Sequence, residues 1–231
     1  MTTQQQTTVI GLGSMGYGMA QSLLRAQHKT FGYDISPKQM SAFQAEGGLS
    51  GDLSHVAPDL NAVVVAVLNA EQTEDVLFGE AGIVKNLSAG AVVVSCATVP
   101  PEFARMMEAR CAEVGVHYLD APISGGSVKA ANGQLSIMAS GTPEAFAAAR
   151  PALDAMAETV FELGETAGAG SAMKAVNQLL AGVHIATMAE AITFGMTQGV
   201  SPEAFVDVIS KCAGTSWMLE NRAPHILSLI H

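Results

Sequence analysis

The sequence predicts an α/β fold over its first two thirds and an all-helical part after that. Strand-like and helix-like segments alternate until Gly164, and strand patterns stop after Gly170. Two runs rich in β-branched residues, "NAVVVAVL" and "AVVVSCA", are typical of strands covered on both faces. We therefore expect a doubly wound, mostly parallel sheet, followed by helices.

The elements of the first part are predicted from local signals. "TTVIGLG" is a strand that ends in glycine, residues 14–27 have helical spacing, and "KTFGYD" is a second strand. Ser36 before Pro37, and Thr142 before Pro143, place a capping hydroxyl ahead of a proline, which indicates a helix start. Further segments predict a helix and then two strands, the second of them half-exposed: "PPEFARMMEARCAEVG", "HYLDAPIS" and "QLSIMASG".

The second part is predicted to be helical throughout. Residues 171–198 form one long apolar helix, Ser201-Pro202-Glu203 begins the next, and "PHILSLIH" at 224–231 belongs to a further helix without a stop signal. We place the domain boundary near Gly164, with a Rossmann-type sheet domain at 1–164 and a helical substrate and dimerisation domain at 165–231. The long helix has more apolar surface than a small domain can cover, so we expect a homodimer or homotetramer.

Composition limits the classes of partner and compartment. Hydrophobic residues make up 49% of the chain and charged residues 14%, which is typical of a globular protein. The net charge of −10 argues against nucleic acid or an anionic membrane as a partner. Three scattered cysteines, without ligand spacing, indicate reduced thiols in a cytoplasmic protein and no metal site.

The stretch "GLGSMG" places glycines at 11, 13 and 16 in G-x-G-x-x-G register. It follows a predicted strand and opens a predicted helix, which is the context of a dinucleotide-binding turn. The expected cofactor contacts are Gly11, Leu12, Gly13, Ser14, Met15 and Gly16.

Asp34 follows the second strand, 18 residues after Gly16. A carboxylate there accepts hydrogen bonds from a ribose and repels a 2′-phosphate, so NAD is favoured over NADP; a surface aspartate is the alternative. Loops after later strands should line the same crevice, which adds Leu68, Asn69 and Thr98. Thr98 could instead be an ordinary strand-end cap.

Lys174 is the only Lys or Arg between Arg150 and Lys211. Its helix position places Asn177 on the same face. An amine beside an alcohol can accept the hydroxyl proton as hydride leaves for a nicotinamide, and an amide can hold the substrate. The alternative is a lysine that extends to solvent from a helix start.

The segment "DAPISGGSVKAANG" offers an anion site. Ser124, Gly125 and Gly126 follow a strand and supply a hydroxyl and backbone N–H groups, suited to a substrate carboxylate. Lys129 adds positive charge there, or is a solvated surface lysine.

Together, "GLGSMG", "DAPISGG" and "GAGSAMKAVNQ" resemble the β-hydroxyacid dehydrogenase family. The resemblance implies Lys174 as the catalytic lysine, Asn177 and the 124–126 segment as substrate ligands, and Thr98 as a cofactor contact. "SGGSVKAANG", "KAVNQLLAGVHIATMAEA" and "SWMLENR" are similar to the L-threonate dehydrogenase branch, which implies oxidation of L-threonate at carbon 2 to 2-oxo-erythronate. Trp217 and Asn221 would then shape the pocket, with core packing as the alternative.

Other activities remain open from the sequence. Within the family they are oxidation of 3-hydroxyisobutyrate and reduction of tartronate semialdehyde. Imine reductases replace the lysine, so Lys174 argues against that chemistry. A 6-phosphogluconate dehydrogenase would need a basic phosphate pocket, and the sequence offers no candidate for one. A non-catalytic dinucleotide-binding module is the reading from a different class. The family also implies a later helix with a Lys-Asp pair, which nothing up to His231 matches.

Overall fold

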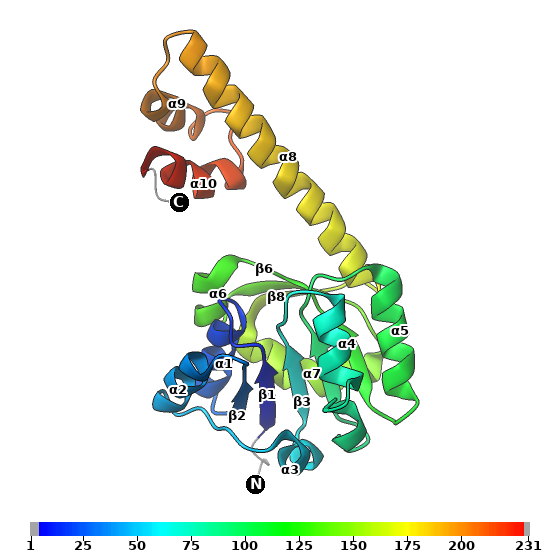
Figure 1. Ribbon diagram of the computed structural model, residues 1–231. Helices are drawn as coiled ribbons and strands as arrows, with labels where there is room; N and C mark the ends of the chain where they lie inside the picture. The colour runs from blue at the N-terminus through cyan, green and yellow to red at the C-terminus, as the bar shows by residue number, and fades with distance from the viewer. Residues whose placement is uncertain (1–4, 229–231) are drawn as a thin grey trace. The chain divides into compact units, whose positions relative to one another are not determined.

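A computed structural model describes residues 5–228 and shows two compact units, 1–174 and 175–231. The first unit contains a five-stranded parallel sheet of order β2-β1-β3-β4-β5 (Figure 1). Its strands are β1 (Gln6–Ile10), β2 (Lys29–Tyr33), β3 (Ala62–Val65), β4 (Val92–Ser95) and β5 (His117–Asp120). The strand order reverses between β1 and β3, where doubly wound sheets bind their ligands. The predicted doubly wound sheet is confirmed.

The last residues of four strands are paired in one row. Ile10 pairs with Val65, Val65 with Ser95, and Ser95 with Asp120. Because the strands are parallel, their carboxyl ends lie at the same edge of the sheet. The glycine turn and the loops after β3, β4 and β5 therefore all start from that edge.

Alternating strand residues face two hydrophobic layers. Val9, Val64 and Leu119 pack on one face and Ile10, Val63 and Tyr118 on the other, and all six are buried. The first face is covered by α1 (Gly16–Arg25), α2 (Pro37–Ala45), α6 (Gly126–Asn132) and α7 (Pro143–Met156). The second is covered by α3 (Leu53–Val56), η1 (Ala57–Asp59), α4 (Ala70–Phe78), η2 (Val84–Asn86) and α5 (Pro101–Ala112). Burial on both faces explains the unbroken valine runs of β3 and β4.

The first unit also contains a second, smaller sheet that the sequence did not predict. Its order is β6-β7-β8, from β6 (Ile123–Ser124), β7 (Leu135–Ala139) and β8 (Ala157–Glu162), with β6 and β7 antiparallel. The expectation that "QLSIMASG" is half-exposed is wrong, because only Ser136 of β7 is not fully buried. The predicted caps are correct: the hydroxyls of Ser36 and Thr142 accept the N–H groups of Gln39 and Ala145.

The described part of the second unit is helical, with most of α8 (Ala169–Thr197) followed by α9 (Pro202–Ile209) and α10 (Trp217–Ser228). Met188, Ile192, Leu219 and Ala223 form its buried cluster. By length and composition α8 could cross a membrane, with a mean hydropathy of 1.4 over 18 residues that are 11% buried. Exposed Leu179, Leu180 and Phe194 contribute to this apolar surface. The predicted continuation of the last helix beyond Ser228 lies outside the described residues.

We expect Gly16→Ala to lower the free energy of unfolding by about 3 kcal/mol, as overpacking of a close backbone contact does. A Cβ at Gly16 would lie 1.8 Å from the Gly11 carbonyl oxygen and 2.9 Å from the Ala66 Cβ. Gly13→Ala is the matched control, because an added Cβ meets no atom within 4 Å there. Urea-induced unfolding of both variants measures the difference, and equal stabilities would contradict this packing.

Candidate active site

The glycine turn joins β1 to α1 and is held by the end of β2. Gly11 has φ +94°, and its N–H donates to the Tyr33 carbonyl at 2.8 Å. The Leu12 N–H donates to Asp34 Oδ2 at 2.7 Å, while the Leu12 side chain is buried in the core. The contribution of Leu12 to cofactor binding, which stays a prediction, is thus limited to its backbone.

The turn leaves donors for an anion. Among the described residues, the N–H groups of Gly13, Ser14 and Met15 have no acceptor in the protein. They precede the first residue of α1, where the helix dipole favours negative charge. The open space in front of Gly13 admits a phosphate. These features fit the pyrophosphate of a dinucleotide.

Asp34 connects this turn to the start of α2. Its Oδ2 accepts from Leu12, and its Oδ1 accepts from the Ser36 N–H at 2.8 Å. Each carboxylate oxygen has capacity for a second hydrogen bond. A half-buried carboxylate beside the glycine turn is therefore suited to the hydroxyls of a ribose.

The loops after β3 and β4 begin at the same edge of the sheet. Leu68 is 83% exposed. The Asn69 side chain caps α4 by accepting the Gln72 N–H at 2.9 Å, so this side chain has a structural task. Thr98 is exposed, and no hydrogen bond of its hydroxyl is found in the described residues. Thr98 is thus more available for a ligand than Asn69.

The segment from Ile123 to Gly126 combines a short strand with two glycines in the left-handed region. Gly125 has φ +137° and Gly126 φ +79°. The half-buried Ser124 has no side-chain hydrogen bond within the described part of the chain. Lys129 packs its stem against Gly125, and its Nζ lies 3.7 Å from Glu158 Oε2. That ion pair offsets the positive charge predicted for an anion site, and the role of Lys129 stays a prediction.

Lys174 lies in the first turns of α8 and is half-buried. Its Nζ donates a hydrogen bond to the Ile123 carbonyl at 2.8 Å. The alternative of a lysine that extends into solvent is therefore not what the structure shows. Burial lowers the pKa of Lys174 below its ordinary value, since a charged ammonium is less stable away from water. A larger fraction of the amine is neutral at a given pH as a result.

Asn177 follows one helical turn after Lys174, in the unit that begins at Ala175. Its Nδ2 donates to Gln178 Oε1 at 3.2 Å. Trp217, 60% exposed, and the exposed Asn221 belong to the same unit, so neither has the core-packing role considered as the alternative. The substrate-binding roles of these three residues stay predictions.

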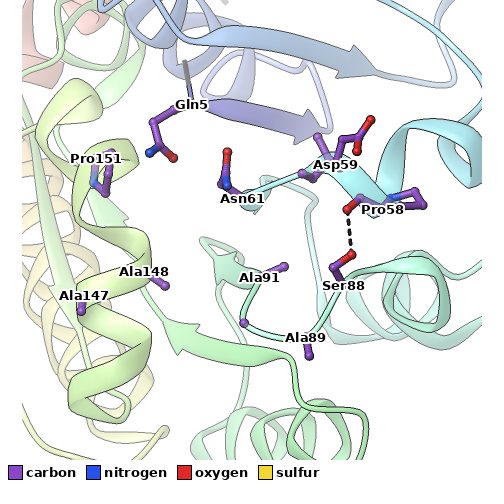
Figure 2. Close-up of a pocket in the computed structure, with 12 residues that line it drawn as sticks. Gln5, Pro58, Asp59, Asn61, Ser88, Ala89, Ala91, Ala147, Ala148 and Pro151 are labelled. Atoms are coloured by element: carbon purple, nitrogen blue, oxygen red, sulfur yellow. Dashed lines mark hydrogen bonds between the residues drawn. The ribbon is translucent and has the colours of Figure 1, made fainter. Parts of the chain in front are cut away.

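Two other polar features in the first unit are unsuited to catalysis. A pocket of about 400 Å³ is lined by residues at the amino ends of β3 and β4, including Asn61 and Ala91, so it lies at the opposite edge of the sheet (Figure 2). Two of its polar side chains are already paired, since Ser88 Oγ donates to the Pro58 carbonyl and Asn61 Oδ1 accepts the Gln6 N–H.

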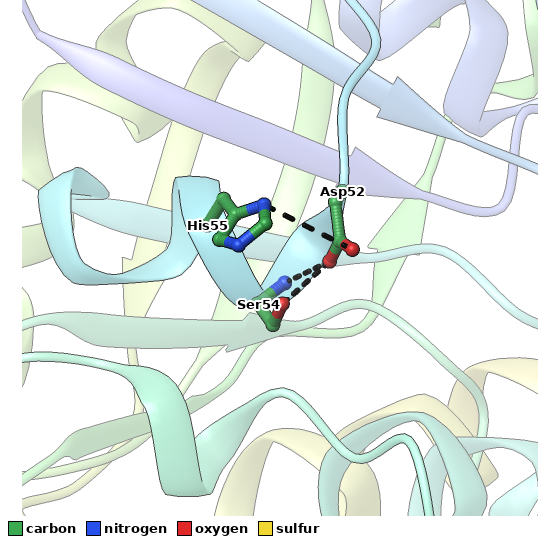
Figure 3. A network of polar contacts seen from close by, with 3 residues as sticks. All are labelled: Asp52, Ser54 and His55. Carbon is green, nitrogen blue, oxygen red and sulfur yellow. Dashed lines mark hydrogen bonds and ion pairs between the residues drawn. The ribbon is translucent and has the colours of Figure 1, made fainter.

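Asp52, Ser54 and His55 form an exposed cluster with the residue types of a hydrolytic triad (Figure 3). Ser54 Oγ donates to Asp52 Oδ1 at 2.6 Å, and His55 Nδ1 lies 3.9 Å from Asp52 Oδ2. A nucleophilic serine must instead bond to the histidine. Hydrogen bonds from Ser54 lower the pKa of Asp52, as expected for a carboxylate that caps α3.

No local sequence pattern predicts a role for Asp120, Ser140 or Ser171, yet these three buried residues meet at the start of α8. The detectable signal was an aspartate at the end of a buried strand. Its partners come from 20 and 51 residues further along the chain, which no local pattern links to it.

Family models match almost the whole chain. Residues 6–164 match the NAD-binding domain of 6-phosphogluconate dehydrogenase. Residues 168–229 match the NAD-binding domain of NADP-dependent 3-hydroxyisobutyrate dehydrogenase.

Similar proteins of known name agree with these models. An L-threonate dehydrogenase of Cupriavidus necator is 48% identical over 95% of this chain and 74% of its own length. One from Haemophilus influenzae is 43% identical over 95% and 73%. A 3-hydroxyisobutyrate dehydrogenase of Pseudomonas aeruginosa is 34% identical over 91% and 70%.

Among solved structures, a 3-hydroxyisobutyrate dehydrogenase from Salmonella typhimurium superposes with a TM-score of 0.92, at 39% identity, over 97% of this chain and 79% of that one. Imine reductases share the fold at lower similarity, for example one from Myxococcus stipitatus with a TM-score of 0.79 at 19% identity over 97% of this chain and 76% of that one. With the glycine turn, the 124–126 segment and the lysine of α8 in place, the chain belongs to the β-hydroxyacid dehydrogenase family of nicotinamide-dinucleotide-binding proteins.

Proposed function

We propose that this protein is an NAD-dependent dehydrogenase that oxidises L-threonate at carbon 2 to 2-oxo-erythronate, with Lys174 as general acid and base. The observation that carries the proposal is the half-buried amine of Lys174, held at 2.8 Å from the Ile123 carbonyl beside the 124–126 segment. The choice of substrate is supported by the L-threonate dehydrogenases that the chain resembles. The likeness to 3-hydroxyisobutyrate dehydrogenases supports that acid as the second candidate.

The chemistry separates a hydride from a proton. The carbinol C–H bond breaks with its electron pair, and the O–H bond breaks as the C=O double bond forms. The bound nicotinamide supplies the hydride acceptor. A neutral Lys174 takes the hydroxyl proton, and returns it in the reverse reaction. Its hydrogen bond to Ile123 uses one N–H and leaves the nitrogen lone pair for this proton.

The acid group of the substrate needs local donors because the chain carries a net charge of −10. The Ser124 hydroxyl and the backbone N–H groups of Gly125 and Gly126 supply them, on the strand whose Ile123 carbonyl also holds Lys174. Carboxylate binding and amine placement thus depend on adjacent residues. This arrangement favours a hydroxyl close to the carboxylate, as in a small hydroxy acid.

The proposed substrate is tested with a panel of three- and four-carbon hydroxy acids, by the absorbance of NADH. We expect kcat/KM for L-threonate to exceed that for 3-hydroxyisobutyrate by at least about tenfold, because 3-hydroxyisobutyrate lacks a hydroxyl on carbon 2 and a site that binds that hydroxyl discriminates against an acid without it. Lys174→Ala should lower kcat with L-threonate by roughly a thousandfold while NAD still binds.

The same assay gives the pH dependence. Because burial lowers the pKa of Lys174, the neutral amine forms at a pH below the ordinary pKa of lysine. The rate of oxidation should therefore rise with pH through the lowered pKa.

In the substrate panel, a preference for 3-hydroxyisobutyrate would change the substrate assignment. Binding of NAD without turnover of any acid would indicate a non-catalytic module.

Asp34 supports a preference for NAD, since a 2′-phosphate would approach its carboxylate. We expect Asp34→Asn to improve kcat/KM for NADP relative to NAD by about tenfold or more, which corresponds to about 1.4 kcal/mol. Asparagine removes the charge but keeps an acceptor for the Leu12 N–H. A wild-type enzyme that already prefers NADP would reject this role of Asp34.

We further propose that a second copy of the chain, rather than lipid, covers the apolar surface of α8, and that the protein is cytoplasmic. An acidic chain is repelled by anionic membranes. All three cysteines are free, and burial raises the pKa of Cys96 and Cys111 to about 12, so these thiols stay protonated. Unpaired, unreactive thiols are typical of a reducing compartment.

Sedimentation of the purified protein without detergent is expected to show a homodimer or homotetramer. Charges introduced at exposed apolar positions of α8, in Leu179→Glu with Val183→Glu, should dissociate it. Gln178→Glu, on the same turns but at an already polar position, is the control and should not. A wild-type protein that is monomeric, or that needs detergent to stay soluble, would contradict this assembly.

A further inference from the structure

The end of β5 holds a fully buried carboxylate, Asp120, for which the proposed chemistry has no use. Its Oδ2 accepts the N–H groups of Gly168 at 2.9 Å and Ser171 at 2.8 Å. Its Oδ1 accepts the Ser171 hydroxyl at 2.7 Å. The Ser140 hydroxyl also donates to Oδ2, at 3.3 Å. A carboxyl group this deep is tolerated only with such complete pairing, so the hydrogen bonds are strongly constrained.

The backbone donors bound by Asp120 belong to the N-terminus of α8. Helix N-termini leave four N–H groups without an intrahelical acceptor. Asp120 accepts two of them, and the Ser140 hydroxyl accepts a third, from Gly170, at 2.9 Å. A carboxylate is also favourable at the positive end of the helix dipole. Asp120 therefore caps α8 from outside the helix.

The contact is close as well as polar. A Cβ at Gly170 would lie 2.3 Å from the Met138 carbonyl oxygen and 2.8 Å from that of Asp120, so the helix backbone is pressed against β5 and β7. Asp120 and Ser140 are paired through their own backbones, at 3.0 and 2.8 Å. The start of α8 is thus fixed to two neighbouring strands.

Lys174 comes three residues after Ser171, less than one helical turn away. Its Nζ is bonded to Ile123, which comes three residues after Asp120. The segment 120–123 therefore holds α8 at two points, with a carboxylate at the helix start and a carbonyl at the amine. A shift of the first point would move the amine away from the second.

We propose that Asp120 is a positioning residue for Lys174: its carboxylate fixes the first turn of α8 so that the amine lies at the Ile123 carbonyl, next to the substrate seat at 124–126. This rests on the proposed catalytic role of Lys174. Asp120 itself touches neither substrate nor cofactor. Its removal should disturb the proton-transfer step more than the binding of either.

The test is a steady-state comparison of Asp120→Ala and Asp120→Asn in the full chain. For Asp120→Ala we expect kcat to fall about a hundredfold, as a displacement near 1 Å does, with the KM for hydroxy acid and the dissociation constant of NAD within about twofold. Asp120→Asn should stay within about fivefold of the wild-type kcat. Its Oδ1 can accept both N–H groups, and its amide can donate to the Ser171 hydroxyl.

The matched control is Asp52→Ala. Asp52 caps α3 with the same chemistry, by accepting the Ser54 N–H at 2.8 Å, but it is exposed on the surface. We expect its loss to leave kcat unchanged. If Asp120→Ala does not fold, Ser140→Ala takes its place, because it removes only the bridging hydroxyl; its kcat should fall several-fold with an unchanged KM.

Three results would overturn the positioning role. They are an unaltered kcat in Asp120→Ala or in its substitute Ser140→Ala, a parallel loss of NAD binding and turnover, and an Asp120→Asn protein as impaired as Asp120→Ala. Lys174→Ala separates this failure from that of the proposed function. If Lys174→Ala retains wild-type turnover, the catalytic role of the lysine is wrong; if it loses turnover while Asp120→Ala does not, only the positioning role is wrong.

Discussion

Parallel pairing of β1, β3, β4 and β5 in one register is the constraint on which the rest of this protein depends. The row Ile10, Val65, Ser95 and Asp120 brings four strand ends level. Four of the candidate binding segments follow within a few residues of that row: the glycine turn, the loops with Leu68 and Thr98, and the segment that leads to Ser124. A register slip of one strand would turn its buried valines to the wrong layer, so core packing also fixes where these loops begin.

The electrostatic surroundings of Lys174 differ from those of a lysine in an ion pair. The chain is acidic, and α8 brings Lys174 to a strand carbonyl rather than to a carboxylate. An acidic partner would have stabilised the charged ammonium, whereas a carbonyl and partial burial leave the neutral form accessible. Lys129, which does have a carboxylate partner in Glu158, is the contrasting case. The same residue type thus has a backbone carbonyl as its partner at one position and a carboxylate at the other.

The similar proteins separate the features that belong to the shared fold from those that belong to the candidate site of this chain. Imine reductases share the architecture at low sequence identity, which speaks for the backbone alone. The particular combination on this chain includes a lysine in the first turns of α8, a hydroxyl and two glycines after β5, and a carboxylate after β2. These residues, and not the sheet, indicate a hydroxy acid and a nicotinamide dinucleotide as ligands.

The sequence by itself determined the parallel sheet, the glycine turn, the capped helix starts and the singular position of Lys174, because each is encoded within one turn or one strand. Only the tertiary structure decided that β8 pairs with β7 in a second sheet, that Lys129 meets Glu158, and that Asp120 caps α8. The partners in these contacts lie far apart in the chain, by 51 residues for Asp120 and Ser171. Their pairing depends on which surfaces the strands and helices bury together, and no local pattern records that choice.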